Sequence, residues 1–142
     1  MISILADSSV VIAGIGSPTG ASHLILELAR KKKITVYTTS IILSEVIRNL
    51  KKKFPPQKAT QFLQFLAKSN FSKIEFLSEK EVLEYSGITA KKDIHIVAAA
   101  YKGKVEYLVS LDKKHILSLR SKKLPFSIVT PSEFLMQIST IF

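Results

Sequence analysis

The sequence predicts an α/β protein, a three-layer α/β/α sandwich around a parallel sheet. Apolar, β-branched runs typical of strands alternate along the chain with stretches of helical periodicity. The strand runs are almost continuously apolar, as in strands that helices cover on both faces of a parallel sheet. The chain has 142 residues, 46% of them hydrophobic, which is enough for one core, so we expect a single domain over residues 1–142.

The first strand is expected at Ile2–Ala6, where an apolar run ends abruptly at Asp7. The next two residues, Ser8 and Ser9, carry hydroxyl groups that can accept hydrogen bonds from free N–H groups, so either is expected to cap the first helix. Asp7 would then lie at the carboxyl end of a strand, where ligands collect in parallel α/β sheets. The glycine-rich stretch 14–20 lacks the ending of a phosphate-binding loop, and we interpret it as a connecting loop.

The remaining elements follow from the same two signals. Helices are expected where apolar residues recur at helical spacing, and strands where β-branched and aromatic residues cluster. The expected helices are Ser22–Lys32, Ile41–Lys53, Gln57–Ser69, Glu79–Tyr85, Lys91–Tyr101, Lys113–Ser121 and Pro131–Ile141. The expected strands are Ile34–Thr39, Lys73–Leu77, Val105–Leu111 and Phe126–Thr130. The helix Lys91–Tyr101 is apolar almost all round, which predicts that it is buried.

Composition restricts the classes of partner. The formal net charge is +10, and a protein this basic often binds polyanions, most simply nucleic acid. Without cysteine the chain has neither disulfides nor a thiolate metal site. No apolar run approaches the about 20 residues that span a bilayer, and the N-terminus lacks the features of an export signal, so we expect no membrane contact and a cytoplasmic location.

Four carboxylates occupy positions that this fold could bring together. Asp7 and Asp112 each end an apolar strand, and the carboxyl ends of parallel strands share one edge of a sheet. Glu45 lies on the flank of the apolar face of its helix, and Asp93 lies on the same side as the buried residues of its helix. Carboxylate oxygens suit Mg²⁺, which can activate a water against a phosphodiester. Ser110 precedes Asp112 by two residues and faces the same side of its strand.

Structural roles for the same carboxylates remain open at this point. Asp93 can serve only as an N-cap for its helix, and Asp112 can cap the helix that follows it. Glu45 can be a solvated helix residue. The histidines form no zinc motif; His95 is interpreted as a satisfied core residue and His115 as an exposed one.

Two lysine pairs flank candidate carboxylates. Lys91 and Lys92 precede Asp93, while Lys113 and Lys114 follow Asp112. Both pairs are expected to begin helices, where the helix dipole disfavours cations. They are therefore candidate contacts for an RNA backbone, with salt bridges to the two aspartates as the alternative interpretation.

Four segments resemble, in order, the motifs of the PIN-domain ribonucleases, the family that includes the toxins of VapBC-type toxin–antitoxin pairs. The segments are ILADSSVV (Ile4–Val11), TTSIILSEVIRNL (Thr38–Leu50), DIHIVAAAY (Asp93–Tyr101) and YLVSLDKKHIL (Tyr107–Leu117). The resemblance covers essentially the whole chain. Each motif alone is weakly specific, but four in the right order are fairly specific.

The resemblance implies a Mg²⁺- or Mn²⁺-dependent endoribonuclease with a PIN-like fold. It implies metal-binding roles for four acidic residues and supporting roles for two serines. These are Asp7, Glu45, Asp93 and Asp112, supported by Ser8 and Ser110. It also implies a homodimer and a cognate antitoxin protein. The alternative is a PIN-fold RNA-binding or regulatory protein with little catalysis.

The chain departs from the family pattern at two places. Ser9 stands where the family often has asparagine, which puts the support of Asp7 in question. Lys91 and Lys92 stand where many relatives carry further acids, which could weaken a second metal site or favour RNA binding.

Overall fold

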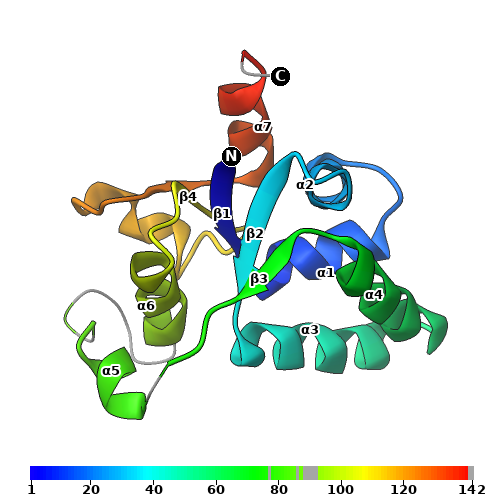
Figure 1. The fold of residues 1–142 in the computed structure, drawn as a ribbon, viewed down its shortest axis with the longest axis horizontal. Coiled ribbons are helices and arrows are strands. Elements are labelled where there is room, and N and C mark those ends of the chain that lie inside the picture. Colours follow the sequence, from blue (N-terminus) through cyan, green and yellow to red (C-terminus); the bar gives the residue numbers. More distant parts are fainter. Residues whose placement is uncertain (77, 86, 88–92, 141–142) are drawn as a thin grey trace.

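The computed structural model describes residues 1–76, 78–85, 87 and 93–140. Its centre is a five-stranded sheet of order β3-β2-β1-β4-β5, in which all neighbouring strands are parallel (Figure 1). The strands are β1 (Ile2–Ala6), β2 (Ile34–Thr38), β3 (Phe71–Lys73), β4 (Tyr107–Val109) and β5 (Ser127–Val129). The predicted parallel α/β fold is confirmed.

Helices fill the connections between the strands. They are α1 (Ser8–Gly16), α2 (Ala21–Arg30), α3 (Ser40–Lys53), α4 (Gln57–Lys68), α5 (Glu79–Leu83), α6 (Ile94–Lys102) and α7 (Pro131–Ile138). Right-handed crossovers place α1 to α4 on one face and α6 on the other, and α7 packs against α2 (Figure 1). Of the described helices, none alone has the length and apolar character to cross a membrane; α1 and α2 pass that test only as a pair bent by 92°.

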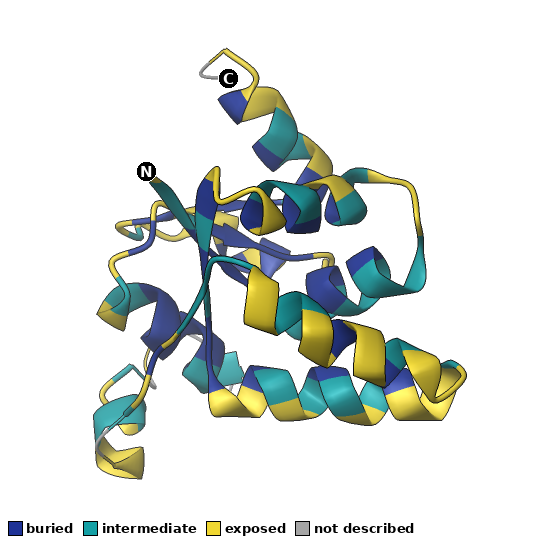
Figure 2. Cartoon of the chain, turned by 45° about the vertical axis from the view of Figure 1, so that its right-hand side comes forward, coloured by how far each residue is buried: buried dark blue, intermediate teal, exposed yellow. Residues whose placement is uncertain are grey.

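The core lies where the two central strands meet the helices. Ile4 and Leu5 of β1 and Leu108 and Val109 of β4 are fully buried. This is the continuous apolar pattern of strands covered on both faces, as predicted. Buried residues follow the strands and the inward sides of the helices, whereas α4 has a largely exposed outer face (Figure 2).

The turn after β1 differs from the prediction in its cap. Asp7 itself, and neither of the two serines, is the N-cap of α1, and its carboxylate accepts a hydrogen bond from Val10 N at 3.4 Å. The carboxylate that ends the strand therefore also begins the helix. As a result its side chain is held between two rigid elements.

Two elements lie elsewhere than predicted. The third strand is Phe71–Lys73 instead of Lys73–Leu77, because Asn70 fixes the segment before it: its N–H donates to Ala29 O at 3.0 Å and its side-chain amide to Ile34 O at 3.2 Å. Residues 113–121 form turns followed by a 3-10 helix, Leu117–Ser121, instead of an α-helix.

Gly14 lies within α1 and not in the predicted loop. The helices α1 and α2 approach closely at this residue. A Cβ at Gly14 would lie 2.5 Å from Leu26 Cδ1 and 3.0 Å from the Ser22 carbonyl oxygen. We expect Gly14→Ala to lower the free energy of unfolding by about 1–2 kcal/mol, since overpacking costs about 1–3 kcal/mol and the better helix propensity of alanine offsets up to about 1 kcal/mol.

Urea unfolding followed by circular dichroism measures this difference. Gly87→Ala is the matched control, because no atom of the described residues lies within 4 Å of a Cβ built there. A gain in stability for Gly14→Ala would contradict the tight contact between the two helices.

Candidate carboxylate site

A cavity of about 220 Å³ opens at the carboxyl ends of the central strands. Its lining includes every carboxylate that the sequence singled out, together with two histidines. The lining residues are Asp7, Ser8, Glu45, Asp93, His95, Ile96, Asp112, His115 and Ile116. They come from the end of β1, the middle of α3, the start of α6 and the turn after β4, so the fold gathers four distant segments around one space.

Asp7 is the most buried of the four carboxylates, at 5% exposed. Its two oxygens are held separately: Oδ1 accepts from the Ser9 hydroxyl and Oδ2 from the Ser110 hydroxyl. Burial raises the pKa of this carboxyl, against the lowering effect of the hydrogen bonds from Ser110, Ser9 and Val10 N. The negative charge of Asp112 nearby raises it further.

Ser9 and Ser110 connect the two central strands at this edge. Besides donating to Asp7, the Ser9 hydroxyl accepts from Leu111 N at 3.2 Å, and the Ser110 hydroxyl accepts from Asp112 N at 2.9 Å. Ser9 therefore supports Asp7, although the sequence comparison had put that support in question. Strand alternation predicted that Ser110 faces the side of Asp112, and its hydroxyl is hydrogen-bonded to both Asp7 and Asp112 N.

Glu45 is half-buried and takes part in a small polar group. Its Oε2 accepts a hydrogen bond from the Ser8 hydroxyl at 2.9 Å, and its Oε1 lies 3.8 Å from His95 Nε2. The solvated alternative is therefore wrong for Glu45. Ser8 lies at the start of α1, so it joins α3 to the strand-to-helix turn that carries Asp7.

Asp93 occupies the N-cap position of α6 but makes no capping hydrogen bond with its side chain. Its Oδ2 is buried and has no hydrogen-bond partner in the part of the chain that the structure describes. A buried carboxylate oxygen without a partner is unfavourable, since desolvation of a polar group is normally offset by a hydrogen bond or a cation. Capping alone does not explain Asp93.

Asp112 is engaged by one neighbour through both oxygens. Oδ1 accepts from His115 N at 3.0 Å, and Oδ2 lies 3.2 Å from His115 Nδ1. Burial raises the pKa of the Asp112 carboxyl, but the hydrogen bonds and charge of His115 and a backbone N–H of Lys114 outweigh it and leave the pKa lowered. Asp112 thus fixes a tight turn while its carboxylate still lines the cavity, and its predicted role as the cap of a following α-helix is wrong, because residues 113–116 form turns.

The histidines differ from their predicted roles. His95 was interpreted as a satisfied core residue, which is wrong: its Nδ1 is buried without a partner among the described residues. Burial lowers the pKa of the His95 ring, and the charges of Glu45 and Asp93 act in the opposite direction. His115 is half-buried instead of exposed, since it is held against Asp112. No motif or spacing indicated the buried, unpartnered Nδ1 of His95 or the contact between His115 and Asp112.

The lysine pairs are placed only in part. Lys91 and Lys92 lie outside the described residues. Lys113 and Lys114 are exposed in the turn after β4, and neither forms a salt bridge with Asp112 in the described structure. They begin no α-helix, so the predicted conflict with a helix dipole is wrong for this pair.

The donor set fits a hard divalent cation. All four carboxylates offer oxygen ligands, and Asp93 Oδ2, which has no partner among the described residues, is an available acceptor at the cavity lining. The four do not converge as a preformed cage: among the described residues, no group of three or more acidic or histidine side chains is close enough to hold a metal ion. A site of this kind suits Mg²⁺, which keeps several waters and binds through one or two direct carboxylates.

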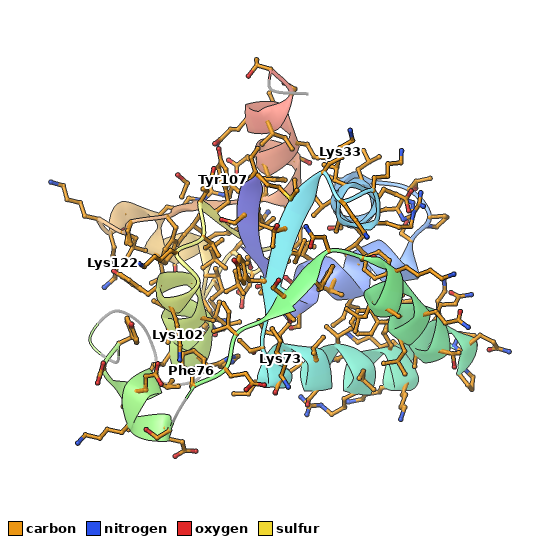
Figure 3. The ribbon with its side chains drawn as sticks, viewed as in Figure 1. Lys33, Lys73, Phe76, Lys102, Tyr107 and Lys122 are labelled. Carbon is orange, nitrogen blue, oxygen red and sulfur yellow. The ribbon has the colours of Figure 1, made fainter. Side chains whose placement is uncertain are left out.

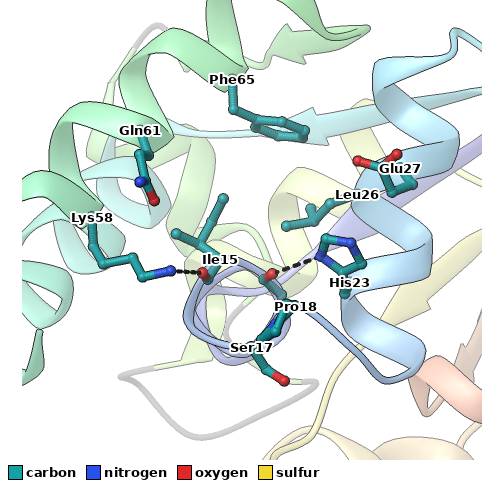
Figure 4. Close-up of a pocket in the computed structure, with 10 residues that line it drawn as sticks. Ile15, Ser17, Pro18, His23, Leu26, Glu27, Lys58, Gln61 and Phe65 are labelled. Atoms are coloured by element: carbon teal, nitrogen blue, oxygen red, sulfur yellow. Dashed lines mark hydrogen bonds between the residues drawn. The ribbon is translucent and has the colours of Figure 1, made fainter.

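A second cavity, of about 260 Å³, lies at the other end of α1, between α2 and α4 (Figure 4). Lys58 Nζ donates to the Ile15 carbonyl oxygen at 3.2 Å, and His23 Nδ1 lies 3.3 Å from the Gly14 carbonyl oxygen. These groups satisfy the last carbonyls of the helix. Glu27 is the one carboxylate in the described lining, so this cavity lacks the cluster found at the first.

Comparisons with known proteins agree with this architecture. The PIN domain family model matches residues 3–114. No curated protein matches the sequence at a significant level. Among solved structures, the chain is similar to VapBC2 from Rickettsia felis, bound to a DNA fragment from its promoter, with a TM-score of 0.63 and 18% identity over 91% of this chain and 98% of that one.

Two further solved structures are similar over most of their length. PAE2754 from Pyrobaculum aerophilum gives a TM-score of 0.62 and 18% identity, over 98% of this chain and 96% of that one. DNA-bound VapBC from Salmonella typhimurium gives a TM-score of 0.62 and 14% identity, over 92% and 99% of the two chains. At these identities the similarity establishes the fold alone.

Proposed function

Because the chain belongs to the PIN domain family, we propose that it is a Mg²⁺- or Mn²⁺-dependent endoribonuclease and the toxin of a toxin–antitoxin pair. The observation that carries the proposal is the cavity at the carboxyl edge of the sheet, which four carboxylates from four separate segments line. The similarity to VapBC structures supports a cognate antitoxin as partner. A homodimer is the assembly that we propose with it.

In this proposal the four carboxylates have two different roles. Asp7, Asp93 and Asp112 hold the cation, one or two of them directly and the rest through its waters, and Glu45 completes or orients the site from α3. A bound Mg²⁺ or Mn²⁺ lowers the pKa of a water and offsets the negative charge of the phosphodiester. The Ser9 and Ser110 hydroxyls keep Asp7 in one orientation, since each holds a different carboxylate oxygen.

The charges around the cavity determine how RNA can bind there. RNA is a polyanion, and a cavity lined by carboxylates repels it unless cations lie between them. Lys113 and Lys114 are exposed beside Asp112 and are the proposed contacts to the RNA backbone there. Lys91 and Lys92 keep the same proposed role from the sequence alone.

The test is cleavage of a mixed, end-labelled RNA pool with Mg²⁺, with Mn²⁺ and with EDTA, for wild type and Asp93→Asn. We expect cleavage that requires metal. We also expect titration calorimetry to show that Asp93→Asn binds the metal at least about 10-fold more weakly, because mutating even a hydrogen-bond partner of a metal ligand costs 10–100-fold in metal affinity. Glu84→Gln, which removes an exposed carboxylate outside the cavity, is the matched control. Cleavage that persists in EDTA, or equal metal affinity in the two proteins, would contradict the proposal.

One observation favours a second candidate, a PIN-fold RNA-binding or regulatory protein with little catalysis. Both oxygens of Asp112 are engaged by His115, so a cation would have to compete for this carboxylate. RNA binding in EDTA, with no cleavage under Mg²⁺ or Mn²⁺, would support this second candidate over the nuclease.

A further inference from the structure

Lysines gather at the edge of the sheet opposite the carboxylate cavity. All five strands are parallel, so every strand is entered from this edge, and the loops that enter them carry exposed lysines. We call this set the basic edge: Lys31, Lys32, Lys33, Lys68, Lys104, Lys122 and Lys123. It lies before the strands, whereas the four carboxylates lie after them or on the helices beside their ends.

The strand register places these lysines at one level. Ile34 is paired with Ile2, so Lys33 stands at the entrance to β2 beside the start of β1. Tyr107 is paired with Ile4 and with Ser127, so the loops that carry Lys104 and Lys123 enter the next two strands at the same level. Strands lie about 4.8 Å apart, so five strands give a row roughly 19 Å long.

The lysines reach outward from this row. Figure 3 shows Lys33 and Lys122 pointing away from the molecule on either side of Tyr107. The salt bridges of the described residues involve none of the seven, and their Nζ atoms take part in no hydrogen bond found there. Glu106 is an exposed carboxylate in the same loop as Lys104, and the charge of Lys31 acts on Glu27, so these two carboxylates offset only part of the positive charge of the seven lysines.

Two of these lysines hold an unusual backbone conformation. Lys32, with φ 58°, and Lys104, with φ 51°, are the non-glycine residues with positive φ in the described chain. Each follows a helix that ends in the same pair of bonds: Lys32 N to Ala29 O and Lys33 N to Leu28 O after α2, with the equivalent bonds after α6. Glycine usually occupies this left-handed position, because a Cβ is unfavourable there.

The helix dipole explains only part of this arrangement. Cations are favourable at the ends of α2, α4 and α6, but the end of α3 carries Lys51–Lys53 for the same reason and lies outside the row. Lys122 and Lys123 follow a short 3-10 helix. Seven like charges along one edge repel one another unless a polyanion neutralises them.

We propose that the basic edge binds the phosphate backbone of RNA, independently of base sequence and at a distance from the carboxylate cavity. This inference rests on the proposed function in taking RNA as the polymer. A long RNA would then be held at two places on the protein, by its cleaved segment at one edge of the sheet and by its backbone at the other.

The test measures binding of wild type to a labelled single-stranded RNA by fluorescence anisotropy, in EDTA and at several salt concentrations. The first variant removes four charges and places glycine at the two positions where φ is positive. It carries the substitutions Lys32→Gly, Lys104→Gly, Lys122→Gln and Lys123→Gln. The matched control lowers the formal net charge of +10 by the same four charges. It carries the substitutions Lys51→Gln, Lys52→Gln, Lys53→Gln and Lys80→Gln. A third variant with arginine at the first four positions keeps the charge.

The expected result is a plot of log affinity against log salt concentration whose slope is less negative by about 2.8 in the first variant, at about 0.7 per lost phosphate contact. The control and the arginine variant should keep the wild-type slope. An equal change of this slope in the first variant and the control would mean that net charge alone binds RNA, and would overturn the proposal. Tighter binding of wild type to duplex DNA with the same number of phosphates would also overturn it. Because cleavage needs metal, a probe cut in EDTA instead counts against the proposed function.

Discussion

Replacing Asp7 with Asn is expected to lower metal-dependent RNA cleavage by at least about 100-fold, since mutating even the partners of metal ligands costs 10–100-fold. Asp7 is the buried carboxylate on which Ser9 and Ser110 converge. Asn keeps the shape and one acceptor oxygen but removes the negative charge. The measurement is the initial rate of cleavage of the labelled RNA pool under Mg²⁺ or Mn²⁺. Rates equal to those of the Glu84→Gln control would show that Asp7 lies outside the catalytic site.

The same variant is expected to unfold at an equal or higher temperature than wild type at pH 7. Burial raises the pKa of the Asp7 carboxyl above its ordinary value of 3.8. When the folded pKa is the higher one, stability falls as pH rises from the unfolded value through the folded value. The wild type therefore carries an unfavourable buried charge at pH 7 that the Asn variant lacks.

Calorimetry without metal, at pH 7 and below pH 3.8, separates this effect from loss of structure. Below that pH the wild-type carboxyl is neutral in both states, so the difference in melting temperature should shrink. A variant that melts well below wild type at pH 7 would show that the charge of Asp7 stabilises the fold, contrary to this expectation.

Phe134→Ala is expected to lower the free energy of unfolding by about 3–5 kcal/mol, the usual range for a buried phenylalanine. Phe134 on α7 is fully buried, and its ring packs edge-to-face on Tyr107 of β4 with centroids 5.1 Å apart. The substitution leaves a cavity where α7 covers β4 and β5. Denaturant unfolding gives the difference directly.

Met136 on the same helix provides the control for this prediction. It is 75% exposed, so Met136→Ala should change the free energy of unfolding by no more than about 0.5 kcal/mol. A loss of less than about 1 kcal/mol for Phe134→Ala would mean that α7 rearranges to close the cavity.

The sequence could predict the elements whose signal is local. An apolar run that stops at Asp7 or shortly before Asp112 marks a strand end, and parallel strands bring such ends together. The expected alternation of the strand likewise placed Ser110 on the same side as Asp112, and its hydroxyl accepts from Asp112 N. The flank position of Glu45 on its helix left open whether its side chain is half-buried or solvated.

What could not be predicted depends on contacts between distant segments. The position of β3 is set by Asn70 reaching Ala29 and Ile34, which no property of the segment Lys73–Leu77 encodes. The unpartnered nitrogen of His95 depends on which groups the fold leaves beside α6. The support that Ser9 gives to Asp7 arises because a hydroxyl at that turn also reaches Leu111 N across the sheet.

The order of synthesis determines when the carboxylate cavity can assemble. β1 can pair with β2 once about a quarter of the chain exists, but its other neighbour is β4, and Ser110 reaches Asp7 across 103 positions. At about 5–20 residues per second, at least about 5 s of synthesis separate these two halves of the cavity. A nascent chain therefore lacks the assembled carboxylates until Ser110 and Asp112 have been synthesised, so the proposed RNA-cutting enzyme has no complete site before that point.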